Sequence, residues 1–490
     1  MRTVARNFIL VTASRLIEGG VRFLTVPIVL GYFGREDFGL MALAFSLHVF
    51  LTLADFSISA NVVRRFSDHL VAGDTGAVLR LARVATSVYV GIGLLNLAVV
   101  LLVGVFAERW FKLEPAQAQA FFWMMLSLGV SSLLTWAGTV YRQVLHASQQ
   151  VGLDEAYNLL ATVGTLLVLG ATLWWRLDLV TYFALVLVPP LLPMWLRARR
   201  ACRLVPGLGF GLSSEWALFS PLLGGTLWLL LMTLADMAAN HFRPILLARA
   251  DGLETVTDFR VMQQVAGFAT LMLTGAMNVA YPAVARLDAA ADHARLRLVL
   301  QQGSRVLLAG HVAVLVPLAF GSALLLELYV GAAYRALALP LALWLLSLLA
   351  LHYTIVMSFA MSRGQMRLLA LGACTNALVS LALAFGLAPR LGLQAMVASY
   401  AAYVVLQMLL MYLLALPAAG GGPGATLAMQ VMTRPLGLAL GVGLPVGAGL
   451  WAAGQPLWWG APLFLAAFAG LMWGPGGLRA DFRALRGRAA

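Results

Sequence analysis

Three charged residues lie on one face of the first long apolar segment of the chain. Arg15, Glu18 and Arg22 are spaced i, i+3 and i+7, and a helix turns by about 100° per residue, so the three side chains share a face. An ionised side chain in hydrocarbon costs roughly 2.5–3.5 kcal/mol, so such residues normally face a water-filled cavity or a partner. We therefore predict that this face lines a path for a substrate or an ion.

The charge of this face indicates what it would bind. Glu18 can pair with either arginine, which leaves the face net positive. A guanidinium stays charged, and its planar fork binds two oxygens at once, which suits a phosphate or diphosphate group. Arg15 and Arg22 are thus candidate diphosphate ligands, and Arg305, at the mouth of a later apolar segment, is a further candidate. The alternative is a static buried ion pair that fastens helices together.

Polar side chains on later segments are candidates for ion coupling. His48 and Asp55 are spaced i, i+7 on the second segment, and Asp236 and Asn240 are spaced i, i+4 on the seventh. Together with Glu18, these residues are candidates to line the cavity or to exchange H⁺ or Na⁺ during transport. The alternative for the stripe of Asp55 is a place near the inner mouth of the segment, without a part in transport.

The elements that must position these residues are membrane-spanning helices. The chain of 490 residues is 61% hydrophobic and only 11% charged, whereas soluble domains are about 25% charged. A spanning helix needs about 20 apolar residues. The sequence predicts an all-α polytopic membrane protein of about 14 transmembrane helices. The predicted segments run near residues 8–32, 39–63, 84–106, 121–141, 157–175, 179–196, 217–240, 261–282, 306–326, 338–361, 368–388, 392–416, 436–454 and 457–474.

The placement of arginine predicts the orientation in the membrane. With the N-terminus in the cytoplasm, the inward loops and tails hold most of the arginines, including the clusters at 197–203 and 479–488. Both termini then face the cytoplasm, as an even number of spans requires. The net charge of +13 is thereby explained by membrane topology and anionic lipid, so we do not expect nucleic-acid binding.

The sequence has no motif for enzymatic chemistry. It lacks a nucleotide-binding loop, a dinucleotide fingerprint and a metal-ligand cluster, and no outward loop is long enough for the catalytic domain of a polymerase or glycosyltransferase. Cys202 and Cys374 lack the spacing of a disulfide framework or metal site. His311 and His352, like His48, individually fit buried histidines with satisfied hydrogen bonds. We therefore predict a protein that is not an enzyme and needs no cofactor.

A weak internal repeat indicates a duplicated architecture. Residues 26–31 match residues 243–248 at an offset of 217, and residues 145–148 match residues 359–362 at an offset of 214. Because an even number of spans separates the copies, the repeat is parallel, an arrangement that places substrate between two lobes. The predicted domains are an N-terminal six-helix lobe at 1–203, a C-terminal six-helix lobe at 204–416, and two additional helices with a basic cytoplasmic tail at 417–490.

Short motifs along nearly the whole chain occur in the order found in one family. They are Ser14-Arg15, Val26-Pro27 through Gly31, Gly34 followed by Phe38-Gly39, Leu53-Ala54-Asp55-Phe56, Arg142 through Gln149, Tyr281-Pro282, Asp288 to Arg297, Leu328 through Tyr334, and Gly392-Leu393-Gln394-Ala395. In these motifs the chain resembles the polysaccharide-transporter branch of the MOP exporter superfamily, the Wzx-type flippases of lipid-linked oligosaccharides. It departs from the family at Ser57, where glycine often follows Asp and a hydrophobic residue.

The resemblance implies two six-helix lobes that alternate access without ATP. It implies as cargo a polyprenyl-diphosphate-linked glycan, moved across the bacterial inner membrane for lipopolysaccharide O-antigen, capsule or exopolysaccharide assembly. The implied partners are this glycan lipid, membrane lipids, H⁺ or Na⁺, and other polysaccharide-assembly proteins. Lipid II is a less favoured cargo, because the arginine-rich opening of its flippases is not reproduced. The alternative within the superfamily is a cation-coupled exporter of small organic compounds, although the net positive face argues against cationic drugs.

Overall fold

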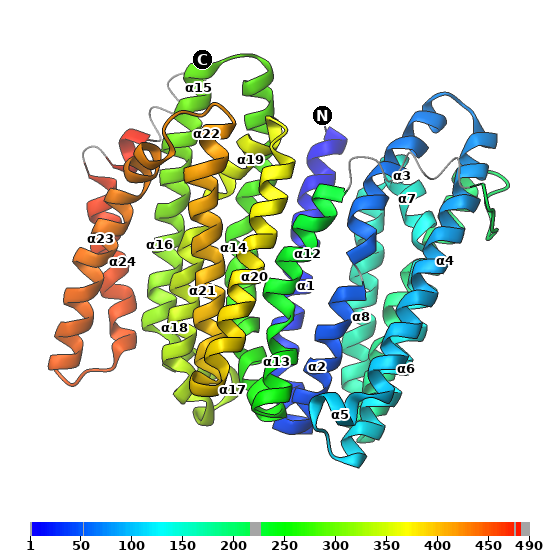
Figure 1. Ribbon diagram of the computed structural model, residues 1–490, viewed down its shortest axis with the longest axis horizontal. Helices are drawn as coiled ribbons and strands as arrows, with labels where there is room; N and C mark the ends of the chain where they lie inside the picture. The colour runs from blue at the N-terminus through cyan, green and yellow to red at the C-terminus, as the bar shows by residue number, and fades with distance from the viewer. Residues whose placement is uncertain (1, 52, 216–226, 475–476, 482–490) are drawn as a thin grey trace. The chain divides into compact units, whose positions relative to one another are not determined.

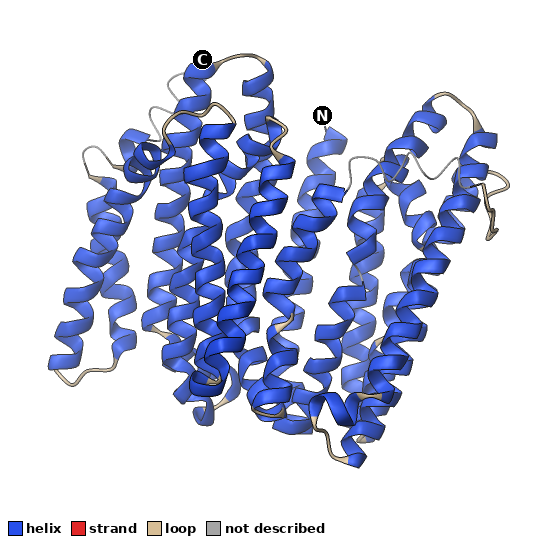
Figure 2. Ribbon diagram, in the orientation of Figure 1, coloured by secondary structure: helices blue, strands red, loops and turns tan. Residues whose placement is uncertain are grey.

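The computed structural model describes residues 2–51, 53–215, 227–474 and 477–481. Within these ranges the chain consists of helices joined by turns and contains no strand (Figure 2). Ten helical stretches of the described residues are long and apolar enough to cross a membrane. The all-α membrane fold predicted from the sequence is therefore confirmed.

The helices divide into two compact units, coloured from blue to red along the chain in Figure 1. Unit 1 comprises Met1–Met237 and Pro244–Arg260, and unit 2 comprises Ala238–Arg243 and Val261–Ala490. The helices of unit 1 are α1 (Arg2–Phe33), α2 (Arg35–Leu51), α3 (Leu53–Val71), α4 (Thr75–Val105), α5 (Ala107–Phe111), α6 (Pro115–Ala137), α7 (Thr139–Ala147), α8 (Val151–Trp175), α9 (Leu179–Val186) and α10 (Leu192–Leu204).

Three helices near the boundary share residues with both units, and the remaining ones belong to unit 2. The shared helices are α12 (Leu227–His241), α13 (Arg243–Ala250) and α14 (Leu253–Ala289). The helices of unit 2 are α15 (His293–Leu298), α16 (Ser304–Phe320), α17 (Ser322–Val330), α18 (Ala338–Ser347), α19 (Thr354–Ser362), α20 (Met366–Leu391), α21 (Leu393–Leu410), α22 (Leu416–Ala418), α23 (Gly424–Ala452) and α24 (Gly460–Trp473).

Each segment predicted from hydropathy coincides with one or more of these helices. Several are single long helices, such as α4 and α20, and the second segment covers parts of α2 and α3, between which residue 52 lies outside the described part of the chain. Residues 217–226 of the seventh segment lie outside the described part of the chain. Ten spanning helices together with the shorter ones are compatible with fourteen membrane crossings.

Capping side chains fix the starts of two helices in unit 1. The carboxylate of Asp74 accepts a hydrogen bond of 2.8 Å from the amide of Ala77 and so caps α4. The carboxylate of Asp178 accepts bonds of 3.1 Å from the amides of Val180 and Thr181 and starts α9. Such caps satisfy amides that have no partner inside the helix.

Two glycines of the family-like motif shape the connection between α1 and α2. Gly34 joins the helices with a φ of +84°, a conformation that glycine adopts without strain. Gly39 on α2 lies against the start of α14, where an added Cβ would come within 2.2 Å of the backbone oxygen of Leu253. The hydroxyl of Thr257 donates to the backbone oxygen of Arg35 at 2.5 Å. The close approach of α2 to α14 therefore requires a residue without a side chain at position 39.

The core of unit 1 forms where α3, α4, α6 and α7 meet. Helices α4 and α6 pack along each other, and the rings of Tyr89 and Trp136 stack with centroids 5.6 Å apart. The buried amide of Gln143 donates to the hydroxyls of Tyr89 and Ser59, the latter at 2.7 Å. This core supports α8, against which the charged α1 packs.

Candidate functional site

Helix α1 carries the charged face predicted from the sequence. Its residues Ala13–Phe33 form a stretch apolar enough to cross a membrane. Nη2 of Arg22 lies 2.6 Å from Oε1 of Glu18, one helical turn away. The side chain of Arg22 is 72% exposed, that of Glu18 is 35% exposed, and Arg15 is exposed as well. The ion pair is therefore not enclosed by protein, and the charge of Arg15 leaves the face net positive.

Hydrogen bonds at the two ends of α8 hold α1 alongside it. The buried hydroxyl of Ser14 donates to the backbone oxygen of Glu155 at 3.4 Å. At the other end, the hydroxyl of Tyr32 donates to the backbone oxygen of Leu177, just beyond α8, at 3.2 Å. Because Ser14 immediately precedes Arg15, the position of α8 determines where the charged face lies.

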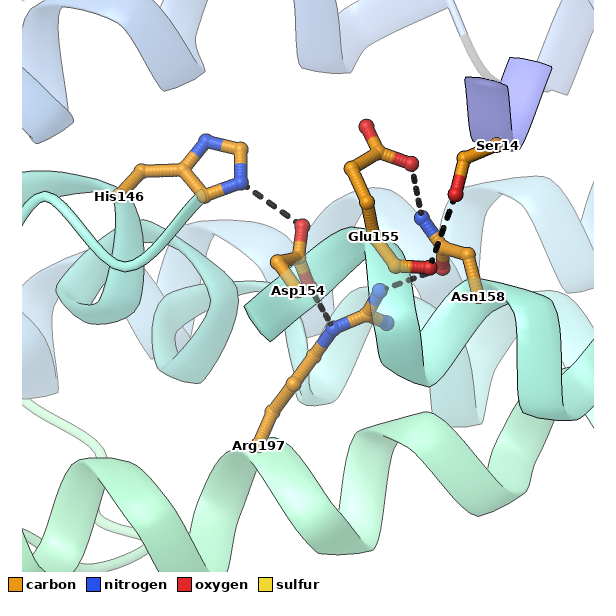
Figure 3. Close-up of polar contacts among 6 residues, drawn as sticks. All are labelled: Ser14, His146, Asp154, Glu155, Asn158 and Arg197. Carbon is orange, nitrogen blue, oxygen red and sulfur yellow. Dashed lines mark hydrogen bonds and ion pairs between the residues drawn. The ribbon is translucent and has the colours of Figure 1, made fainter. Parts of the chain in front are cut away.

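A buried ion-pair network fixes the end of α8 on which α1 rests (Figure 3). The carboxylate of Asp154 lies between Arg197 of α10 and His146 of α7, with Oδ1 2.5 Å from Nε of Arg197 and Oδ2 2.7 Å from Nε2 of His146. Nη2 of Arg197 also donates to the amide oxygen of Asn158 at 2.7 Å, and Asn158 donates to the carboxylate of Glu155 at 3.3 Å. One carboxylate thus joins three helices.

This network is not predicted from the sequence. There, Arg197 is predicted only as part of a basic cluster that sets the orientation, and Asp154 lies outside the predicted segments. The spacing nevertheless contains a signal, because both residues are about 20 residues, or one membrane thickness, from the turn between α8 and α9. Antiparallel helices bring such positions together, so opposite charges there indicate an ion pair.

The predicted ion-coupling residues other than Glu18 lie on α2, α3 and α12. His48 is half-buried on α2, and its Nδ1 has no hydrogen-bond partner among the described residues. Asp55 falls on α3, and its side chain lies outside what the structure describes. On α12, Asp236 is exposed and Asn240 is half-buried, and the backbone oxygen of Asn240 accepts a bond of 3.2 Å from Gln263. Their part in ion coupling stays a prediction.

Arg305, the third predicted diphosphate ligand, is bound by protein groups within unit 2. Its Nη1 lies 3.2 Å from Oδ1 of Asp481, and its Nε and Nη2 donate to the backbone oxygen of Gln430 at 3.3 and 3.0 Å. Burial raises the pKa of the Asp481 carboxyl above its ordinary value, although Arg305 and Arg434 act to lower it. These contacts join α16 to α23 and to the short helical segment at residues 478–481, and a role for Arg305 in ligand binding stays a prediction.

Comparison with solved structures identifies the architecture. The structure of the lipid II flippase MurJ in an inward closed conformation matches over 95% of this chain and 99% of that chain, with a TM-score of 0.69 and 12% identity. A multidrug resistance MATE family transporter of the MOP superfamily matches in its inward-facing conformation over 86% of this chain and 94% of that chain, with a TM-score of 0.54 and 14% identity. A MATE family transporter in an outward-facing conformation matches over 85% of this chain and 96% of that chain, with a TM-score of 0.56 and 12% identity. At such low identities the likeness shows the fold alone.

Sequence comparison identifies the family. No curated protein sequence matches the chain significantly. The family model described as "Polysaccharide biosynthesis protein" matches residues 4–288, which is more than half of the chain and includes the charged face of α1 and the network around Asp154. The resemblance stated from the sequence is thereby confirmed. The chain is a multi-pass membrane protein and belongs to the polysaccharide biosynthesis protein family.

Proposed function

We propose that this chain is a flippase that moves a polyprenyl-diphosphate-linked oligosaccharide from the cytoplasmic to the periplasmic leaflet of a bacterial inner membrane. The translocated glycan would supply O-antigen, capsule or exopolysaccharide assembly, and other proteins of that assembly would be its partners. Family membership and the fold of flippases and transporters support movement of a lipid-linked glycan rather than catalysis.

The charged face of α1 is the observation that carries this proposal. Arg15 and Arg22 are exposed within a helix apolar enough to span a membrane. Their guanidiniums would form charge-assisted hydrogen bonds with the diphosphate. Glu18 would hold the fork of Arg22 in place, since the two side chains already meet at 2.6 Å. A cationic, water-filled cavity at this face would lower the cost of carrying two phosphates through the membrane.

The membrane potential would contribute to the direction of transport. Moving one charge through 100 mV is worth about 2.3 kcal/mol, and a doubly charged diphosphate leaving an inside-negative cytoplasm would gain about twice that. Exchange of H⁺ or Na⁺ at Glu18, Asp55 or Asp236 would then return the empty site. In this cycle, the predicted six-helix lobes at 1–203 and 204–416 would alternate access, with both termini in the cytoplasm.

A protection assay in proteoliposomes tests the proposal. A labelled polyprenyl-diphosphate oligosaccharide is placed on one leaflet, and its exposure to an impermeant enzyme is followed with and without a membrane potential. We expect protein-dependent transfer that the potential accelerates. Losing a hydrogen bond to a charged group costs about 1.5–3 kcal/mol, so each of Arg15→Ala and Arg22→Ala should weaken cargo binding roughly 10–150-fold.

The matched control is Arg109→Ala, which removes an exposed arginine from the short helix α5. This variant should flip the cargo at the wild-type rate. If the double variant Arg15→Ala/Arg22→Ala flips normally in a correctly inserted protein, the ligand assignment is wrong. If folded wild-type protein transfers none of a range of glycan lipids, the flippase function itself is wrong.

The similarity to MATE structures supports a second candidate, a cation-coupled exporter of small organic compounds. The net positive face of α1 disfavours cationic drugs as cargo, because like charges repel. Drug-resistance profiling of a strain that overexpresses the protein separates the two functions. Increased resistance without any effect on glycan transfer would favour the exporter.

A further inference from the structure

Unit 2 contains four buried polar side chains that the proposed flipping mechanism does not use. They are Ser304, His311, His352 and Tyr412, and each is at most 2% exposed. Ser304 and His311 lie two turns apart on one face of α16. Helix α16 packs against the 3₁₀ segment Leu348–Tyr353, which contains His352, and against α23, which in turn contacts the segment of Tyr412. The cluster therefore draws on three separate parts of unit 2.

The four side chains are near neighbours. The rings of His352 and Tyr412 have centroids 5.7 Å apart. His311 and His352 are close enough to repel each other when both are charged. The hydroxyls of Ser304 and Tyr412 also lie close together, but neither satisfies the geometry of a hydrogen bond. The arrangement is thus a series of neighbouring buried polar side chains among apolar core residues of unit 2, such as Leu308 and Val312.

Most hydrogen-bonding groups of the cluster have no protein partner among the described residues. Nδ1 of His352 donates to the backbone oxygen of Leu349 at 2.8 Å. The lone pair on Nε2 of the same ring then has no donor among the described residues. Both ring nitrogens of His311 and the hydroxyl oxygens of Ser304 and Tyr412 also lack partners. This result differs from the expectation that His311 and His352 are satisfied core histidines. Because buried polar groups are nearly always hydrogen-bonded, these atoms indicate a site for bound water or an ion.

The backbone around the cluster is irregular in all three parts. Ser304 directly follows the π-helical turn Val299–Gly303, and Tyr412 lies in a second π-helical turn, Met411–Ala415. His352 lies in a 3₁₀ segment between α18 and α19. Short π-helical and 3₁₀ segments within longer helices often occur at functional sites and hinges. The irregular segments support a functional site rather than an accident of core packing.

The chemistry of the side chains favours a proton over a metal ion. The cluster contains no carboxylate, whereas Na⁺ and other hard cations prefer several oxygen ligands. Nor do the described residues contain any group of three or more His, Cys, Asp or Glu side chains that would hold a metal ion. Imidazole is the side chain that ordinarily changes its charge between pH 5 and 8. Two imidazoles with free nitrogens and two hydroxyls are suited to hold a proton together with water.

We propose that Ser304, His311, His352 and Tyr412 form a proton-binding site in which His311 and His352 share one proton through bound water. A hydronium ion gives its proton to the lone pair of a ring nitrogen and leaves a water molecule, and the site gains one positive charge. The second imidazole and the hydroxyls accept or donate the remaining hydrogen bonds. The use of this proton for coupling rests on the proposed flippase function, whereas proton binding itself does not.

The charged groups nearest to this site along the chain and on packed helices have other partners. Arg305 pairs with Asp481, Glu327 of α17 pairs with Arg335, and Arg434 of α23 donates to the backbone oxygen of Leu471. Repulsion between His311 and His352 disfavours a second proton on the pair. The other titratable or charged side chains on the elements packed against the cluster are Tyr329, Tyr353, Arg367, Cys374, Arg390, Tyr400 and Tyr403.

The first experiment measures proton binding without any cargo. The full chain, labelled with ¹⁵N-histidine, is reconstituted in lipid vesicles, and the ring nitrogens of its seven histidines are followed by solid-state NMR between about pH 3 and pH 8. His311→Gln and His352→Gln assign the signals, and His293→Gln, at an exposed site on α15, is the control. We expect both buried rings to respond in one shared step, and loss of either ring to shift the other's midpoint by about one pH unit, a tenfold change in proton affinity.

Two results of this titration would overturn the proposal: rings that stay neutral over the whole range, or rings that titrate independently of each other. Tyr412→Phe removes only a hydroxyl and should shift the shared midpoint without unfolding the protein. This variant keeps the test valid if a histidine variant fails to fold.

The second experiment tests coupling, with the membrane potential held at zero and a labelled polyprenyl-diphosphate oligosaccharide as the probe. With one proton exchanged per cargo, a gradient of one pH unit should shift the transmembrane distribution about tenfold in the wild type, and not in His311→Gln or His352→Gln. An equal shift in these variants would refute coupling through this site. If wild-type protein moves no cargo, the flippase function fails, while the NMR titration still decides whether the site binds a proton.

Discussion

The ion pair between Asp154 and Arg197 allows a test of whether the two side chains stabilise the fold together or independently of each other. Asp154 is 4% exposed and Arg197 is 13% exposed on their side chains. Asp154→Asn leaves the guanidinium of Arg197 without its charged partner, and the neutral side chain of Asn158 then accepts its remaining hydrogen bond. Removing one partner of a buried ion pair costs about 3–5 kcal/mol, because the other charge stays buried without compensation.

The reverse substitution should cost less. In Arg197→Gln, the carboxylate of Asp154 keeps His146, whose ring lies 2.7 Å away and is partly exposed. A protonated His146 can then replace the lost charge, so we expect a cost of about 1–3 kcal/mol. In the double variant Asp154→Asn/Arg197→Gln, neither charge is left unpaired and two amides of similar shape can bond to each other. Its cost should be below that of Asp154→Asn alone, at about 1 kcal/mol.

The assay is thermal unfolding in detergent, followed by the fluorescence of the chain's 13 tryptophans at one scan rate. For a unit of 150–250 residues, 1 kcal/mol shifts the melting temperature by about 2–4 °C, so Asp154→Asn should lower it by roughly 6–20 °C. Arg203→Gln changes an exposed arginine on the same helix and should stay within about 0.5 kcal/mol of the wild type. If the costs of the two single substitutions simply add in the double variant, the residues are not coupled and the reasoning is refuted.

Three further predictions follow from other contacts. Gly39→Ala places a Cβ 2.2 Å from the backbone oxygen of Leu253; the helices must move apart, and the melting temperature should fall by an amount that reflects about 1–3 kcal/mol. The guanidinium of Arg243 donates to Ser380 and Ser399 while it lies over the ring of Tyr400, and the ammonium group in Arg243→Lys cannot reproduce this geometry. We expect the free energy of unfolding to fall by about 3 kcal/mol, and an unchanged melting temperature would contradict this role. Because the pKa of Asp481 is raised in the folded protein, the folded state holds its proton more tightly than the unfolded chain, and its contribution to stability falls as pH rises from about 4. As the pH rises from about 4, the melting temperature of the wild type should therefore fall relative to that of Asp481→Asn. If the melting temperatures of the two proteins instead change in parallel with pH, the pKa of this carboxyl is not raised.

The sequence predicted the membrane fold well because the thickness of a bilayer fixes how many apolar residues a crossing needs. Hydropathy carries no information about helix type, however. The π-helical and 3₁₀ segments of unit 2 could therefore not be read from apolar periodicity. The need for glycine at position 39 depends on the start of α14, which lies beside α2 but is far from it in sequence.

The candidate site was predictable to the extent that its residues lie on one helix. The spacing of Glu18 and Arg22 places them one turn apart, and the structure pairs them at 2.6 Å. The contacts of Arg197 with Asp154, and of Arg305 with Asp481, link residues far apart in sequence. Their pairing depends on which helices become neighbours, and a single sequence does not specify this.

A comparison of the Asp154–Arg197 pair with the Glu18–Arg22 pair indicates whether the charged face of α1 stabilises helix packing or binds a ligand. Asp154 and Arg197 form a structural ion pair, since Asp154 is buried, Arg197 is only 13% exposed, and each has a further hydrogen bond. The pair of Glu18 and Arg22 is largely exposed, and an exposed pair contributes only about 0–1 kcal/mol to stability. Placing charges in a spanning segment costs roughly 2.5–3.5 kcal/mol each. Fastening therefore does not offset the cost of Arg15, Glu18 and Arg22, and binding an anionic group accounts better for their presence.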